Sequence, residues 1–226
     1  MSMATTKEKT ATLDLWAAAF PDHTAWNGKF LLRRNGPLLS GICLDEMRDP
    51  KTYRPTFFYH NLICDWPVVT LGYGVSLQQR GVPKALKYGS VGDEPVGLKA
   101  QIEAARLPAS FSLFLKHISE ARRGAFGPMA VYLPHALRDV MSVGSYLGDA
   151  AFFSSHLSSA ADLIISAKNV NLQIIGSVDQ WTRDVGNLLS SNLEALVQQS
   201  LQKLRLPSLT NESLPYVRPD AFPICI

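Results

Sequence analysis

The sequence predicts an α+β protein, with an N-terminal antiparallel sheet followed by a mostly helical C-terminal half. Before residue 73 the chain holds dense runs of aromatic and β-branched residues, which are typical of strands. After residue 98, apolar residues recur at helical spacings of three and four. Of the 226 residues, 46% are hydrophobic and 18% are charged, so the chain can bury a sizeable core and is not intrinsically disordered.

The N-terminal lobe, residues 10–90, is expected to hold one helix and the sheet. Leu13, Trp16 and Phe20 follow helical spacing, which predicts a helix over residues 10–20 after a disordered start at 1–9. The first two strands flank Asn35-Gly36, a strong hairpin signal because both residues tolerate a positive φ. Strands are expected at residues 30–34, 38–44, 56–64 and 66–73, with a charged loop at 45–54.

The helical lobe, residues 97–206, follows a glycine- and proline-rich stretch that is the best boundary between the lobes. Helices are expected at residues 98–106, 110–123, 134–147, 154–167 and 179–206, with short strands at 129–133 and 171–176. Ser110 is predicted to cap the second of these helices. An alternative fold recruits residues 129–133 and 170–176 into a single mixed sheet. In either fold we expect one domain over residues 1–226, which the two lobes would subdivide.

The predicted helix 179–206 carries a long apolar stripe at spacings of three and four. Such a stripe can pack on the body of the protein or on a second copy, so a homodimer through this helix is one expected arrangement. Residues 207–226 contain Pro207, Pro215, Pro219 and Pro223, which predict an extended tail that lies over the body.

Charge and cysteine content exclude several classes of protein. The net charge of +3 is a small excess, without the concentrated basic field of a dedicated DNA-binding domain. The three cysteines, Cys43, Cys64 and Cys225, are too few and too far apart for a disulfide framework. No apolar signal segment follows Met1, and no stretch approaches the ~18 apolar residues of a membrane span. We therefore expect a soluble cytoplasmic protein that does not enter a membrane.

The sequence offers no strong metal or cofactor motif, so none is predicted. His60 and Cys64 are four residues apart on a predicted strand, which separates them by ~13 Å at ~3.3 Å per residue. Two ligands at that distance cannot share one zinc ion, and no C-x-x-C pair completes the set. The segment 144–148 also lacks the G-x-S-x-G pattern of a serine nucleophile elbow.

Aromatic and basic residues alternate through the first hundred positions, and they form the first functional hypothesis. The candidate binding residues are Arg33, Arg34, Tyr53, Arg54 and Tyr59. Tyrosine and arginine are enriched where proteins bind one another, so a protein partner is favoured over single-stranded nucleic acid. The predicted function is a non-enzymatic, cytoplasmic protein-interaction module, of the kind found among bacterial accessory or immunity-type binding proteins.

A metal-dependent phosphodiester hydrolase is the alternative hypothesis. Asp45 and Asp49 lie in the charged loop at 45–54, and paired carboxylates can hold Mg²⁺ for phosphoryl chemistry. His60, on the following predicted strand, would complete such a nuclease-like site. Asp45, Asp49 and His60 are therefore the catalytic candidates of this alternative.

Overall fold

The computed structural model describes residues 3–71, 73–79, 82–104, 110–122, 133–167, 170, 174–220 and 222. It confirms the α+β class, with an antiparallel sheet in the N-terminal half and a mostly helical C-terminal half. The chain forms two compact units, each built from separate stretches. The sheet unit comprises residues 1–60, 68–108 and 205–212, and the helical unit comprises residues 61–67, 109–204 and 213–226.

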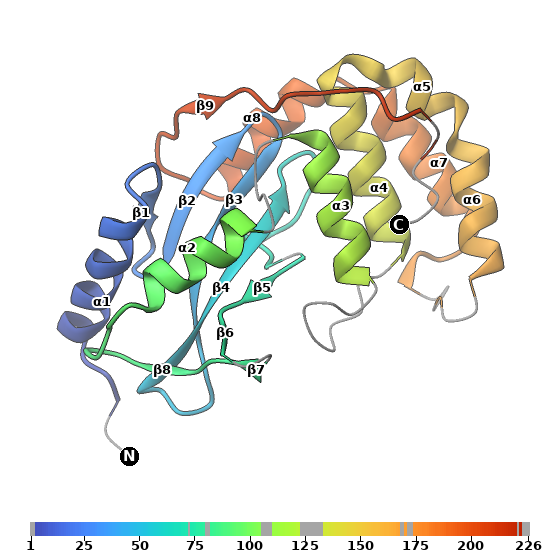
Figure 1. Ribbon diagram of the computed structural model, residues 1–226. Helices are drawn as coiled ribbons and strands as arrows, with labels where there is room; N and C mark the ends of the chain where they lie inside the picture. Colours follow the sequence, from blue (N-terminus) through green and yellow to red (C-terminus); the bar gives the residue numbers. More distant parts are fainter. Residues whose placement is uncertain are drawn as a thin grey trace. The chain divides into compact units, whose positions relative to one another are not determined.

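The sheet unit contains a main sheet with the strand order β1-β2-β3-β4-β5, in which β8 also pairs with β4 and β9 with β2. Its helices α1 and α2 lie side by side over one face of this sheet (Figure 1). The short strands β6 and β7 form a separate pair. The elements are α1 (Thr6–Ala19), β1 (Thr24–Trp26), β2 (Phe30–Asn35), β3 (Leu38–Glu46), β4 (Thr52–Asn61), β5 (Val75–Ser76), β6 (Gln78–Gln79), β7 (Val82–Pro83), β8 (Leu86–Lys87), α2 (Glu94–Ala104) and β9 (Asn211–Glu212).

The predicted hairpin is confirmed as β2 and β3. Asn35 pairs with Leu38 at its end, and Gly36 has a φ of 57°, which the tight turn requires. The other edge of β2 is shared by two strands. β1 pairs antiparallel with its first half, and β9 runs parallel to Arg34 and Asn35.

Helix α1 begins earlier than its apolar spacing predicts, and the expectation of a disordered start up to residue 9 is wrong for residues 6–9. The cause is a capping box. The Thr5 hydroxyl accepts from the Glu8 amide at 3.2 Å, and the Glu8 carboxylate accepts from the Thr5 amide at 2.7 Å. Trp16 anchors the helix in the core, where it is fully buried and its indole N–H donates to the Tyr53 hydroxyl at 3.0 Å.

The described part of the predicted strand at 66–73, residues 66–71 and 73, forms no strand, and the preceding strand is placed differently. β4 begins at Thr52, inside the expected loop, and ends at Asn61, before the predicted limit at residue 64. The Asn61 side chain accepts from the Ile63 amide at 3.0 Å, so it forms an Asx turn that ends the strand. A second turn follows, in which the Trp66 amide donates to the Cys64 carbonyl at 2.7 Å.

The helical unit contains seven described helical segments around an aromatic and aliphatic core. Ser110 caps α3 as predicted, because its hydroxyl accepts from the Leu113 amide at 3.3 Å. The elements of the helical unit are α3 (Phe111–Arg122), α4 (Leu133–Gly144), the kinked segment η1 (Ser145–Asp149), α5 (Ala150–Ser155), α6 (Leu157–Ser166), α7 (Val178–Leu189) and α8 (Leu193–Lys203). None of the helices in the described ranges is long and apolar enough to cross a membrane.

The single helix predicted at 179–206 is wrong, because the chain forms α7 and α8 there. Helix α7 ends just before Ser190 and Ser191, whose hydroxyls donate to carbonyl oxygens of α7. Ser190 donates to Gly186 at 2.9 Å, and Ser191 donates to Leu188 at 2.6 Å. Asn192 then caps α8 by accepting from the Ala195 amide at 3.1 Å. A homodimer through these residues stays a prediction, and it would use two helices in place of one.

Two other expectations fall largely outside the described residues. The predicted strand at 129–133 is described only at Leu133, which begins α4. The predicted strand at 171–176 is described only from Ile174, where the backbone forms a helical turn and a bend. The alternative mixed sheet, which needs both segments, stays a prediction for the remaining positions.

Candidate functional site

The predicted binding residues lie on β2 and β4, and the two tyrosines belong to the interior. Tyr53 and Tyr59 are 0% and 2% exposed, respectively. Burial raises the pKa of Tyr53 to about 12 and raises the pKa of Tyr59 well above its usual range. Since residues two apart on a strand share a face, Tyr53 and Tyr59 point to one side of β4 and Arg54 points to the other.

Two arginines of this set, Arg33 and Arg34, bond to other residues of the sheet unit. The Arg34 side chain is buried, and its Nε donates to the Gly36 carbonyl at 2.9 Å. Arg33 forms an ion pair with Glu212 of β9, and its side chain is 25% exposed. The five residues therefore occupy both faces of the sheet and are not gathered into one patch, and their role in binding a partner stays a prediction.

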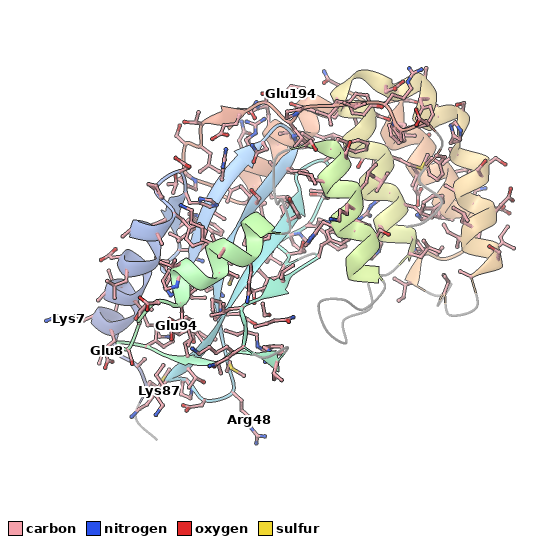
Figure 2. The ribbon with its side chains drawn as sticks, in the orientation of Figure 1. Lys7, Glu8, Arg48, Lys87, Glu94 and Glu194 are labelled. Atoms are coloured by element: carbon pink, nitrogen blue, oxygen red, sulfur yellow. The ribbon has the colours of Figure 1, made fainter. Side chains whose placement is uncertain are left out.

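The three candidates for the hydrolase site do not come together. Asp45 lies at the end of β3, and Asp49 lies in the β3–β4 turn, where its carboxylate accepts from the Lys51 amide at 3.0 Å. Figure 2 shows Arg48 extending away from the sheet at this turn. His60 lies eight residues beyond the start of β4, roughly 26 Å along a strand that rises about 3.3 Å per residue.

His60 is instead part of the packing of the sheet unit. It is 1% exposed, and its Nδ1 accepts from the Thr70 amide at 3.1 Å. Among the residues whose positions are described, no group of three His, Cys, Asp or Glu side chains could hold a metal ion.

Cys64 belongs to a buried polar cluster that joins residues 61–67 to α4. The side-chain Nδ2 of Asn61 donates to the Asp139 carboxylate at 3.1 Å and to the Ser142 hydroxyl at 2.9 Å. The Cys64 thiol donates to the same Asp139 oxygen at 3.3 Å. Burial, followed by the neighbouring Asp139 charge, raises the pKa of Cys64 well above its usual range. The thiol is therefore held in its protonated form, and the cluster serves packing.

A second cluster forms where the C-terminal tail lies on the helical unit. We call residues 213–220 together with Phe222 the tail. It is extended, as predicted for residues after 207, and Figure 1 shows it running across this unit toward α5. The Phe111 amide, at the start of α3, donates to the Pro215 carbonyl at 2.9 Å. Along the tail, Leu214 is 7% exposed and Val217 is 70% exposed.

The centre of this second cluster is the carboxylate of Asp149, which is 5% exposed. Arg218 donates two charge-assisted hydrogen bonds to this carboxylate, from Nε at 2.5 Å and from Nη2 at 2.6 Å. The Tyr216 hydroxyl donates to the same carboxylate at 2.8 Å. The hydrogen bonds from Arg218 are the main reason that the pKa of Asp149 is lowered, and burial is the main reason that the pKa of Tyr216 rises to about 12.

Aromatic rings surround this carboxylate. The Tyr216 ring lies 5.2 Å from the Phe111 ring, and the Arg218 guanidinium lies 5.6 Å from the centre of the Phe152 ring. Farther along the tail, the Phe222 ring stacks on His156 at 5.4 Å with an interplanar angle of 11°. We call Phe111, Asp149, Phe152 and His156 the Asp149 site.

A distorted helix places Asp149. The segment from Ser145 to Asp149 contains a kink between α4 and α5, because the backbone of Gly148 is non-helical with a φ of 109°. That backbone conformation is rarely open to a residue with a Cβ, so glycine is needed there. The sequence predicts a helix over 134–147 and no nucleophile elbow at 144–148, but it does not point to Asp149, because its partners Tyr216 and Arg218 are far away in the sequence.

The chain matches no protein-family model, no curated protein and no solved structure. The two clusters differ in what they hold together. The cluster around Cys64 holds parts of the chain together, whereas the Asp149 site already holds an extended segment by its side chains. Such an arrangement can bind a peptide.

Proposed function

We propose that the protein is a non-enzymatic, cytoplasmic protein-interaction module and that the helical unit is its binding part. This proposal rests on the hydrogen bonds that the Asp149 carboxylate accepts from Tyr216 and Arg218, which are two residues apart in an extended segment. A role as an accessory or immunity-type binding protein belongs to the same proposal, since such proteins act by holding a partner.

The spacing along the tail supports a mode of peptide recognition. In an extended segment, successive side chains point to opposite sides, and recognition sites use alternate ones. Leu214, Tyr216 and Arg218 follow this spacing, and Val217 between the last two points outward with 70% of its surface exposed. A bidentate pair between arginine and a carboxylate adds directional specificity to this recognition.

The experiment is capture of the partner by the tagged full-length protein in the cells that express it, followed by reconstitution from purified components. We expect one partner at a stoichiometric amount, and 1:1 binding when the two purified proteins are mixed in a titration calorimeter. Absence of a stoichiometric partner would overturn the proposal. So would hydrolysis of a generic phosphodiester substrate that is lost in Asp45→Ala, since that result supports the alternative hydrolase.

A further inference from the structure

We infer that the tail is a built-in competitor for the Asp149 site, and that the partner of this site is an extended peptide with an aromatic residue two positions before an arginine. The inference rests on the proposed function and names the chemistry of the partner. The tail supplies the template, since Tyr216 and Arg218 are the side chains that the site holds.

Charge and hydrogen bonding define what can replace the tail. The Asp149 carboxylate is 5% exposed and receives three hydrogen bonds from tail side chains. A peptide that takes the place of the tail covers this carboxylate again and excludes water from it, so the peptide must bring equivalent donors. Arginine presents two parallel N–H groups to a carboxylate, whereas lysine offers a single point charge. The site is therefore expected to distinguish arginine from lysine.

The aromatic surroundings define the rest of the ligand. Phe111 packs against the Tyr216 ring, and Phe152 lies against the Arg218 guanidinium. A flat guanidinium packs well against an aromatic face and an aromatic side chain packs well against another ring, so both contacts favour the same pair of residue types. Phe222, which is 3% exposed, covers His156. Removal of the tail would thus uncover aromatic surface of the kind that marks interaction sites.

The tail is attached in a way that allows exchange. Within residues 213–220 and 222, a single main-chain hydrogen bond joins it to the helices, from Phe111 to Pro215. Pro215 and Pro219 have no N–H to donate. The Arg218 side chain is 64% exposed, so water and a competing peptide can reach it. The tail can therefore leave without breaking the hydrogen bonds of any described helix.

Competition by a tethered segment lowers the apparent affinity for a free peptide. A tail on a short connection acts at an effective concentration in the millimolar range, so a free peptide of the same sequence binds the intact protein poorly. A substitution that weakens the tail but leaves the site intact should strengthen binding of that free peptide. Arg218→Ala is such a change, because it removes two of the three side-chain hydrogen bonds to Asp149.

The test is a titration of a fluorescent peptide of residues 213–222 with full-length protein, followed by fluorescence anisotropy. We expect the peptide to bind the Arg218→Ala protein at least about tenfold more tightly than the wild type, because the tethered competitor is weakened. Val217→Ala is the matched control, since this neighbour is exposed, and it should behave as the wild type. The same peptide with lysine or alanine in place of its arginine should bind the Arg218→Ala protein at least about tenfold more weakly.

Equal affinity of the peptide for the wild type and for Arg218→Ala would overturn the inference. The inference would also be overturned if the peptide bound the double variant Asp149→Asn with Arg218→Ala as tightly as it binds Arg218→Ala. If this double variant does not fold, hydrogen exchange of the Phe111 amide provides an independent test, because that amide donates to the tail. Its exchange should be faster in Arg218→Ala than in Val217→Ala, and equal rates would contradict the inference. If Asp149→Asn captures a stoichiometric partner as well as the wild type does, this inference is refuted but the proposed function is not. If the peptide binds as expected but no cellular partner is found, only the proposed function is refuted.

Discussion

Acidification is expected to destabilise the sheet unit through His23, which follows α1. The ring of His23 packs edge-on against Phe20 at 5.5 Å, and both its nitrogens are buried without a hydrogen-bond partner among the described residues. Burial, and then the nearby positive charge of Arg33, lower the pKa of His23 from its ordinary value of 6.5 to about 4. The folded protein therefore keeps His23 neutral at a pH where the unfolded chain is protonated.

The sign and size of the effect follow from this difference in pKa. Between pH 6.5 and about 4 the unfolded state binds the extra proton, so the free energy of unfolding decreases as the pH falls. A difference of one pKa unit corresponds to about 1.4 kcal/mol, which gives a total loss of about 3 kcal/mol below the folded pKa. At pH 5 the protonated fraction of the unfolded state accounts for about 2 kcal/mol of that loss.

The assay is urea unfolding of the wild type and of His23→Phe at pH 7, 6 and 5. His23→Phe keeps an aromatic ring but cannot titrate. From pH 7 to pH 5 the free energy of unfolding of the wild type should therefore decrease by about 2 kcal/mol more than that of the variant. The capping carboxylate of Glu8, whose pKa is lowered by its hydrogen bonds to Thr5, titrates mainly below this range and is present in both proteins. Parallel pH dependence of the two proteins would refute the reasoning.

Three further substitutions or treatments test the packing. In Gly41→Ala the new Cβ would lie 2.2 Å from the Leu31 carbonyl oxygen across the hairpin, so we expect a loss of about 3 kcal/mol or more in urea unfolding. Gly28→Ala is the control, with a φ of 68° and no neighbour within 4 Å, and should lose only about 1–2 kcal/mol; equal losses would contradict the account. Tyr53→Phe removes the acceptor of a buried indole N–H, and urea unfolding should show a loss of about 1–3 kcal/mol. Cys64 should resist iodoacetamide at pH 8 in the native chain and react after unfolding, as followed by peptide mass spectrometry, and rapid native labelling would show that the thiol is accessible.

Local signals predicted the elements whose structure is decided locally. Asn35-Gly36 fixed the hairpin, and Ser110 fixed the start of α3, because a tight turn and a cap each depend on a few adjacent residues. The capping box of Thr5 and Glu8 was equally visible in the sequence, but apolar spacing alone placed the start of α1 too late.

The errors arose where a pattern continued past a break or where the partners were distant. The apolar stripe of α7 and α8 runs through the serines that separate them, so periodicity alone could not locate the end of α7. At the candidate site, Asp149 and Arg218 are 69 residues apart in the sequence. No spacing rule joins residues at that separation, and only the fold brings the carboxylate and the guanidinium together.

The pairing of β9 with β2 has a consequence for synthesis of the chain. Residues 24–46 leave the ribosome early and can form β1, β2 and β3 at once, but the edge of β2 beside Arg34 and Asn35 is completed only by residues 211–212. Until then, part of that edge has unpaired main-chain groups, which are open to a strand of another nascent chain. The ion pair between Arg33 and Glu212 spans 179 residues, so this edge closes only after the residues between them have been synthesised, and the rate of elongation sets how long the edge stays open.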